Sequence, residues 1–404
     1  MRNLKKFIFK KQTLFILFLV LSLLIHLNEK KFNRLEKELN DLKKEKEDEN
    51  LSNLLLKEDK DIKKIQNKIR ELKGIETIIN IMNYLPNYQE IQKDGLENLG
   101  NIAYENEENQ NKITELKGIE TIINTMNKFP NHKEIQANGL RAFMNIAYKN
   151  EDNKNKIREL QGIEAIINTM NKFPENEEIQ ANGLRALWSN RNKIRELEGI
   201  ETIINAMNKF QKNKEIQRVG IGALMNIAYK NEDNRNKIRE LKGIETIINT
   251  MNKFPENEEI QRVGIGALMN IAYYNEENQN KIRELKGIET IINAMNKFPE
   301  NEEIQRVGIG ALMNIAYYNE DNKNKIRELK GIETIINTMN KFPENEEIQK
   351  NGIGALMNIA YKNEENLNKM KELNRIELIQ KGMNKFPNNR DIQNWGSELL
   401  TKLQ

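Results

Sequence analysis

The stretch NKFPENEEIQRVGIGALMNIAYYNE at residues 252–276 recurs without a change at 296–320. A second tag, GIETIIN, exact or with one or two changes, marks the same period through most of the chain. It begins at Gly74, Gly118, Gly162, Gly199, Gly243, Gly287 and Gly331, and a last relative, RIELIQK, begins at Arg375. Successive intervals are 44, 44, 37, 44, 44, 44 and 44 residues. Repeats of this length predict a solenoid of paired or triple helices.

Each repeat predicts three helices, and residues 234–273 show the pattern. NRNKIRELK is a short helix, and Gly243 follows it at a position suited to a left-handed C-cap. IETIINTMNKF has apolar residues at helical spacing, and Pro255 ends this second helix. Asn257 offers an N-cap to a third helix, EEIQRVGIGALMNIAY. Its apolar stripe consists of Ile260, Val263, Gly264, Ala267, Leu268 and Ile271. No segment suggests a strand, so the predicted fold class is all-α.

The second-helix tag GIETIIN and the third-helix pattern IQRVGIGALMNIA resemble armadillo repeats. The resemblance covers nearly all of residues 60–404. It implies a right-handed α-solenoid of about eight three-helix repeats, in which the third helices line a concave groove that binds extended peptides. Such repeats bury their core only by stacking on their neighbours.

One repeat is shorter than the others, with an interval of 37 rather than 44 residues. Comparison of residues 139–160 with 183–197 places the deletion at the equivalent of NIAYKNE, the end of a third helix and the loop after it. We expect a kink near 187–192, with Trp188 as a large apolar filler. The alternative is that the neighbouring helices slide to absorb the loss.

The amino terminus is a basic tail, 1–12, followed by a run without charged residues, 13–27. As a helix this run spans roughly 22 Å, which is short of the ~30 Å hydrocarbon core, but flanking lysines can snorkel to the surface. We interpret it as an uncleaved transmembrane or signal-anchor helix. The alternatives are a cleaved signal peptide and a buried or interfacial helix.

The orientation of this anchor is not given by the basic residues, because lysine and arginine occur on both sides of it. We expect the repeat domain to face the cytosol. Residues 28–59 predict a charged helical linker, with a dimerising coiled coil as the alternative. The solenoid then occupies 60–404.

Composition excludes several chemistries. The chain has no cysteine, so it offers no thiol nucleophile or zinc–thiolate site. The two histidines, His26 and His132, do not form a metal site or a general base in this pattern. A formal net charge of +4 on 64 basic and 60 acidic residues does not favour nucleic-acid binding. We therefore expect no enzyme activity, catalytic residue, cofactor, metal or small-molecule substrate, and the oligomeric state stays open.

Candidate binding residues follow from helix geometry. Positions four apart differ by only about 40° around a helix, so Arg262, Gly266 and Asn270 share one arc of the third helix. The same set recurs in stacked repeats and would form ladders. By the resemblance, the asparagines bind a peptide backbone, to which an amide can both donate and accept. The candidate groove residues are Asn101, Asn145, Asn226, Asn270, Asn314, Asn358, Arg218, Arg262, Arg306 and Lys350.

The arginine and lysine ladder favours acidic or phosphorylated segments, because guanidinium pairs well with carboxylate and phosphate. The alternative is that Glu258 and Glu259 pair with Arg262 as ordinary contacts on the helix surface. Importin-α-like repeats often carry tryptophan four residues before the asparagine, and this chain has Glu, Arg or Gly there. That difference argues against nuclear import of basic cargo.

Near-identical neighbouring repeats supply a long surface and avidity. A catalytic site would instead need a set of residues that occurs at one place only. We therefore expect a membrane-tethered, non-enzymatic scaffold that binds protein segments in its groove. The alternatives are a purely structural spacer and a secreted or lumenal repeat protein.

Overall fold

The computed structural model describes residues 73–188, 198–373 and 376–403. These residues form helices joined by turns and loops, without a strand among them. They fall into two compact units, one ending at Ala165 and the other beginning at Ile166. Within the described part of the chain, no helix is both long and apolar enough to cross a membrane. The predicted anchor 13–27 and the linker 28–59 lie outside the described residues.

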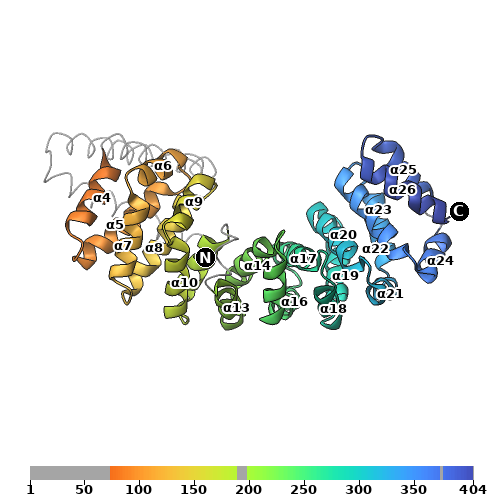
Figure 1. Cartoon of the computed structure of the whole chain (residues 1–404), viewed down its shortest axis with the longest axis horizontal. Helices are drawn as coiled ribbons and strands as arrows, with labels where there is room; N and C mark the ends of the chain where they lie inside the picture. Colours follow the sequence, from red (N-terminus) through yellow and green to blue (C-terminus); the bar gives the residue numbers. More distant parts are fainter. Residues whose placement is uncertain (1–72, 189–197, 374–375, 404) are drawn as a thin grey trace, which may run out of the picture. The chain divides into compact units, whose positions relative to one another are not determined.

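The helices follow the predicted order of first, second and third helix in each repeat (Figure 1). The first compact unit contains α4 (Gly74–Tyr84), α5 (Gln89–Ala103), α6 (Glu107–Glu115), α7 (Gly118–Lys128), α8 (Lys133–Ile146) and α9 (Glu151–Glu159). Helix α10 (Gly162–Lys172) crosses the boundary. The second compact unit contains α11 (Glu177–Leu187), α13 (Gly199–Lys209), α14 (Lys214–Ala228), α15 (Glu232–Glu240), α16 (Gly243–Lys253), α17 (Glu258–Ala272), α18 (Glu276–Glu284), α19 (Gly287–Lys297), α20 (Glu302–Ala316), α21 (Glu320–Glu328), α22 (Gly331–Lys341), α23 (Glu346–Ala360), α24 (Glu364–Glu372), α25 (Ile376–Lys385) and α26 (Arg390–Leu403).

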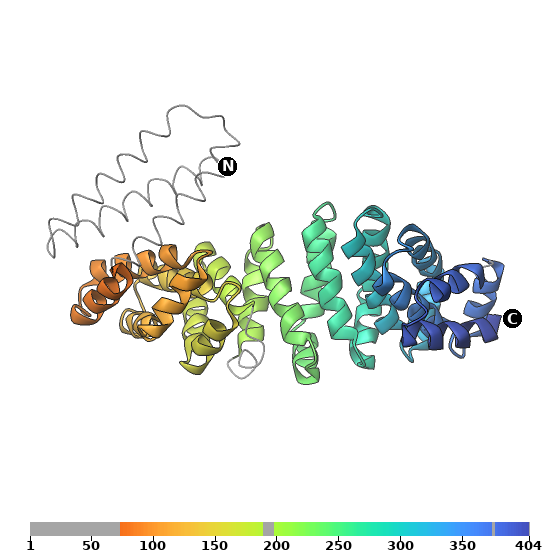
Figure 2. The same ribbon diagram turned by 90° about the horizontal axis from the view of Figure 1, so that it is seen from above.

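Third helices of consecutive repeats pack side by side. In the second compact unit α14, α17, α20, α23 and α26 contact one another in that order, and Figures 1 and 2 show the same succession. In the first compact unit α5 packs on α8 in the same way. The stripe predicted for α17 is buried throughout, because it faces both its own second helix and the neighbouring repeat. The right-handed superhelix expected for the whole chain stays a prediction.

The predicted end of the second helix and the predicted start of the third helix are confirmed. Helix α16 ends at Lys253, two residues before Pro255. Asn257 is the N-cap of α17, and its Oδ1 accepts a hydrogen bond from the Ile260 N–H at 3.0 Å. Proline therefore ends one helix and an asparagine side chain starts the next, as the sequence predicts.

The predicted glycine C-cap is wrong by one residue. Lys242 has the left-handed conformation, with φ 60°, and Gly243 is the first residue of α16. A Cβ atom on Gly243 would lie 2.7 Å from Ile238 Cγ2 and 2.9 Å from the Ile238 carbonyl oxygen. Glycine is required here because two helices approach closely, not because of its backbone freedom.

The shorter repeat loses the end of its third helix, as expected. Helix α11 has 11 residues, whereas α17 has 15. Residues 189–197 lie outside the described residues, so the kink stays a prediction. Trp188 follows α11, and its ring atoms lie 2.6 Å from where a Cβ on Gly222 of α14 would be. In the next repeat Met225 covers Gly266 in the same manner, so Trp188 replaces a methionine at this position.

Candidate functional site

The neighbouring helices α14, α17, α20 and α23 repeat the same half-exposed side chains at each step. We call this surface the third-helix face. It consists of Arg218, Met225, Asn226, Arg262, Met269, Asn270, Arg306, Met313, Asn314, Lys350, Met357 and Asn358. The two remaining candidate residues, Asn101 and Asn145, lie in α5 and α8 of the first compact unit. The structure therefore brings most of the predicted set together on one surface.

The asparagines of this face cap the helices of the preceding repeat. The Asn270 side chain donates from Nδ2 to the Met225 carbonyl oxygen at 2.9 Å. This carbonyl is among the last four of α14, which have no partner within the helix. The equivalent bonds run from Asn145 to Gly100 at 2.8 Å, Asn226 to Trp188 at 2.7 Å, Asn314 to Met269 at 3.0 Å and Asn358 to Met313 at 3.1 Å.

One N–H of each of these amides is thus engaged by the fold, which leaves Oδ1 and the second N–H. No protein group within the described residues donates a hydrogen bond to Oδ1 of Asn226, Asn270, Asn314 or Asn358. Asn145 differs, because it is 5% exposed and so is buried between repeats. The amides on the third-helix face are therefore held in a fixed orientation with an acceptor at the surface.

Gly266 does not lie on the open arc where the sequence placed it. It is buried, and a Cβ atom there would lie 2.9 Å from Met225 Sδ of the preceding repeat. Met225, Met269 and Met313 of the third-helix face each cross to the next helix and cover its second glycine. Gly266 is buried because one repeat stacks on the next, and this stacking cannot be inferred from the helical period of a single repeat.

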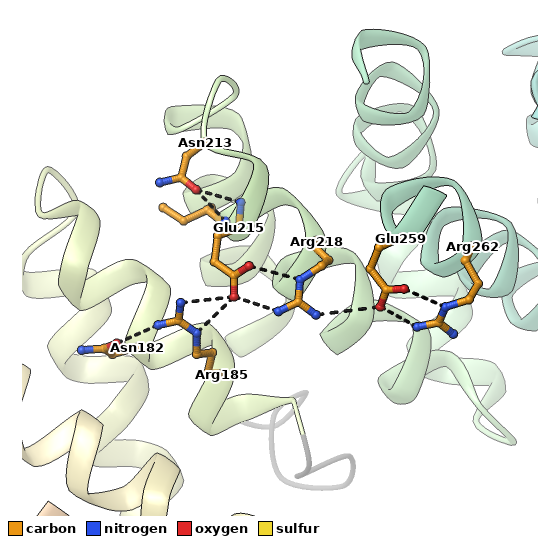
Figure 3. Close-up of polar contacts among 8 residues, drawn as sticks. Asn182, Arg185, Asn213, Glu215, Arg218, Glu259 and Arg262 are labelled. Atoms are coloured by element: carbon orange, nitrogen blue, oxygen red, sulfur yellow. Dashed lines mark hydrogen bonds and ion pairs between the residues drawn. The ribbon is translucent and has the colours of Figure 1, made fainter. Parts of the chain in front are cut away.

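The arginines alternate with glutamates across consecutive third helices, and we call this set the ion-pair row (Figure 3). It runs through Arg185, Glu215, Arg218, Glu259, Arg262, Glu303, Arg306 and Glu347.

Within a helix of the ion-pair row, Arg262 Nε and Nη2 lie 3.0 and 2.7 Å from the two carboxylate oxygens of Glu259. Between helices, Arg185 Nη2 lies 3.2 Å from Glu215 Oε1, and Arg306 Nη1 lies 3.0 Å from Glu347 Oε1. The interpretation of Arg262 and Glu259 as a pair on the helix surface is confirmed. The row is charge-balanced, because each guanidinium already contacts a carboxylate.

The same contacts favour the ionised form of two carboxyls in the row. The hydrogen bond from Arg262 holds the pKa of the Glu259 carboxyl below its usual 4.5. The hydrogen bond from Arg306 lowers the pKa of Glu303 in the same way. Lys350 is different, since no ion pair forms at it within the described part of the chain. It is the candidate cation of the third-helix face that stays available to a ligand.

A row of tyrosines, the tyrosine ladder, follows the third helices α17, α20 and α23. It comprises Tyr273, Tyr274, Tyr317, Tyr318 and Tyr361. Consecutive ring centroids lie 4.4, 4.7, 4.4 and 5.6 Å apart, all in edge-to-face geometry. Such contacts are favourable because the positive ring edge meets the negative ring face.

Of the two histidines, His132 lies among the described residues. His132 is the N-cap of α8, and its Nδ1 accepts from the Ile135 N–H at 3.4 Å. This is a structural role. Among the described residues no group of three or more histidines, cysteines or carboxylates is placed to hold a metal ion.

Three protein families match parts of the chain. The C-terminal domain of protein zer-1 homologues matches residues 142–323, the GAC ARM domain matches 33–190 and the LRRK2 ARM repeat matches 282–404. No curated protein sequence matches the chain.

Solved structures share the fold at low sequence identity. An engineered protein matches with a TM-score of 0.73 and 22% identity, over 84% of this chain and 80% of that one. A designed armadillo repeat protein in complex with the peptide (KR)4 matches with a TM-score of 0.51 and 22% identity, over 60% and 99%. The chain is built from armadillo repeats. A structure from a study of the interaction between cadherin and beta-catenin also matches, with a TM-score of 0.64 and 12% identity, over 84% and 77%.

The tyrosine ladder is the part of this armadillo surface that sequence reasoning missed. The signal was present, because Tyr274 and Tyr318 stand where other repeats have Lys149, Lys230 or Lys362. The two tyrosine pairs lie in the repeats that share the duplicated stretch. Contact between tyrosines of consecutive repeats depends on the stacking distance, which the sequence does not contain.

Proposed function

We propose that this armadillo protein is a non-enzymatic scaffold that binds an extended segment of a partner protein along the third-helix face. The observation that carries the proposal is the repeated, half-exposed row of asparagines whose Oδ1 atoms have no partner among the described residues. An extended peptide offers backbone N–H and C=O groups at regular intervals, and an amide with one acceptor and one donor left can bind both.

Preorganisation strengthens this proposal. Each face asparagine is held by its bond to the preceding helix, for example Asn314 to the Met269 carbonyl at 3.0 Å. A side chain that is already ordered loses little further entropy when a ligand binds. Half-exposed methionines beside the amides add an adaptable apolar surface. Repetition of the same contact over several helices would add up along one ligand.

The family supports a protein ligand in general terms. The designed armadillo relative was solved in complex with a peptide, (KR)4. That likeness shows the fold alone, so the ligand of this chain must be argued from its own side chains.

The expected preference for acidic or phosphorylated segments stays a prediction with narrower support. The guanidiniums of Arg218, Arg262 and Arg306 contact glutamates, so an acidic ligand would have to compete with them. Lys350 lacks such a partner among the described residues. An acidic group would therefore bind best near α23.

We also propose that residues 13–27 anchor the chain to a membrane with the repeats facing the cytosol. The support for this proposal is the uncharged run in the sequence. Protease protection of a C-terminal tag on intact membranes tests it. Digestion of the tag with residues 1–27 retained by the membrane agrees with the proposal. Protection of the tag, or loss of the first segment, contradicts it.

The test of the binding function is a selection of peptides from a random display library against the full-length chain. Met269→Lys with Met313→Lys alters the third-helix face. Asn249→Lys with Asn293→Lys is the matched control, because it adds the same charges at exposed positions of the second helices α16 and α19. We expect selected peptides to bind the control like the wild type and the face variant at least tenfold more weakly.

The alternative of a purely structural spacer gives a different result in this experiment. A spacer would yield no selected peptide, or peptides that bind both variants equally. Circular dichroism of both variants checks that the added lysines leave the helices intact.

A further inference from the structure

The tyrosine ladder forms one wall of a pocket of about 500 Å³ in the second compact unit. The pocket also borders the third-helix face, so its lining combines aromatic rings with the side-chain amides. Its lining residues are Tyr273, Tyr274, Met313, Asn314, Tyr317, Tyr318, Gly354, Met357, Asn358, Tyr361, Trp395 and Glu398.

The aromatic walls are open to a ligand. Tyr274 is 59% exposed and Tyr318 is 67% exposed, although both contact neighbouring tyrosines. Trp395 of α26 lies 2.9 Å from where a Cβ on Gly354 would be, so that glycine lets the indole approach α23. The result is a set of ring faces and edges around one space.

The charged group of the pocket lining is acidic. Among the described residues Glu398 is the single charged side chain of the lining, and Oδ1 of Asn314 and of Asn358 has no partner in this part of the chain. Burial and the neighbouring Tyr274 and Tyr318 raise the pKa of Tyr317 to about 12, so its hydroxyl is neutral at physiological pH. A ligand group with several N–H donors and a positive charge matches this surface.

The chain's own lysines show the same preference at the edge of the pocket. Lys323, Lys362 and Lys402 each place Nζ 5.4 to 5.9 Å from the Tyr361 ring centroid. Lys402 Nζ also lies 3.5 Å from Glu398 Oε1, in a half-exposed pair that a ligand can share or displace. In the described structure no lysine or arginine lies over the rings of Tyr274 or Tyr318.

We propose that this pocket binds the cationic side chain, arginine or lysine, of the partner segment. The proposal rests on the proposed function, of which the pocket would be one subsite. A cation is attracted to aromatic faces and gains most where water is excluded. Arginine fits especially well, because its planar guanidinium can stack on a ring while its N–H groups reach several acceptors. The tyrosines follow the third helices, so this subsite lies at the edge of the asparagine row, with which it shares Asn314 and Asn358.

The backbone conformation at Tyr274 and Tyr318 allows a double substitution that tests this proposal. Tyr274 and Tyr318 have left-handed φ values of 47° and 49°, and Lys230 and Lys362 have φ 53° at the equivalent positions. Tyr274→Lys with Tyr318→Lys therefore restores a residue type that this backbone already accepts. It replaces two exposed rings with two cations and should leave the fold intact.

The probes are N-acetylarginine amide and N-acetylcitrulline amide, which have similar shape but differ in charge. Trp395 fluorescence in a Trp188→Phe background reports binding, because the chain has only two tryptophans. We expect the arginine probe to bind roughly tenfold more tightly than the citrulline probe. We expect the double tyrosine variant to lose this binding, Glu398→Gln to weaken it, and the Asn249→Lys, Asn293→Lys control to retain it.

Equal binding of arginine and citrulline, or binding that survives in the double tyrosine variant, would overturn the proposal. The small probe does not need the rest of the third-helix face. Binding of the probe without binding of any long peptide would therefore contradict the proposed function and leave the pocket standing. Binding of a long peptide without binding of the arginine probe would contradict the pocket proposal and leave the proposed function standing.

Discussion

Amide side chains complete the hydrogen bonding of the short helices in this protein. Helix α14 ends at Ala228, and its last carbonyls lack partners inside the helix. Asn270 Nδ2 donates to the Met225 carbonyl at 2.9 Å, and Asn234 Nδ2 donates to the Ile227 carbonyl at 2.9 Å. Many asparagines of the repeats are therefore explained by the helix ends, and only their remaining polar atoms are available for function.

A threonine between repeats gives the first prediction. Thr250 Oγ1 donates to Gln217 Oε1 at 2.6 Å, whereas the duplicated repeat has Ala294 at this position. We expect Thr250→Ala to lower the free energy of unfolding by about 1 kcal/mol, because a buried acceptor loses its donor. Urea denaturation measures the change. Asn249→Ala, at an exposed position of the same helix, is the control, and an equal effect of both variants would refute the assignment.

Two neighbouring glycines of α17 give the second prediction. A Cβ on Gly264 would lie 2.6 Å from both Cγ and Sδ of the buried Met251, so Gly264→Ala should cost roughly 1–3 kcal/mol of stability. A Cβ on Gly266 would meet only the far end of the half-exposed Met225, 2.9 Å away at Sδ. Its repulsion is offset by the higher helix propensity of alanine, about 1 kcal/mol. Denaturation should therefore rank Gly264→Ala well below Gly266→Ala, and the opposite order would contradict this packing.

The third helices carry both the core and the candidate site. One side of α17 packs on α16 and its flanks pack on α14 and α20, so little of the helix remains for a ligand. The ion-pair row crosses this remaining strip and joins one third helix to the next. Its individual pairs are partly exposed, so each contributes modestly to stability.

The pH dependence of the ion-pair row is the third prediction. Hydrogen bonds from Arg262 and Arg306 lower the pKa of Glu259 and Glu303 below 4.5 in the folded chain. The unfolded chain then binds more protons, so these carboxylates stabilise the fold above their unfolded pKa, and that stability is lost as the pH falls through the folded value. We expect the free energy of unfolding to fall below about pH 4.5, and Arg262→Gln to reduce this fall. Urea titrations from pH 7 to pH 3 measure it. Identical curves for the two proteins would argue against the pairing.

At the scale of the whole molecule, the repeat period was enough to predict the armadillo helices and most of their ends. Pro255 and Asn257 act locally, so their effects could be inferred from the sequence. Gly243 was misplaced by one residue because its role depends on contact with Ile238, which local turn preferences do not include. The partners of the arginines and the contacts of the tyrosines were not predictable in detail, because they join residues of different repeats.

The duplicated repeats give the molecule one region with a distinct surface. They differ at three positions, Thr250/Ala294, Glu277/Asp321 and Gln279/Lys323, none of which lies on the third-helix face, and both carry a tyrosine pair. Duplication therefore lengthens the third-helix face and repeats the tyrosine pair from which most of the tyrosine ladder is built.

The most direct test of the central claim is a titration of the full-length chain, labelled at its methionine methyl groups, with a peptide selected on it. Methionines of the third-helix face and buried methionines of the second helices are reporters in the same molecule. Binding along the face predicts NMR shifts at Met225, Met269, Met313 and Met357, with Met207, Met251, Met295 and Met339 nearly unchanged. Tight binding that leaves the face methionines unshifted would contradict the account.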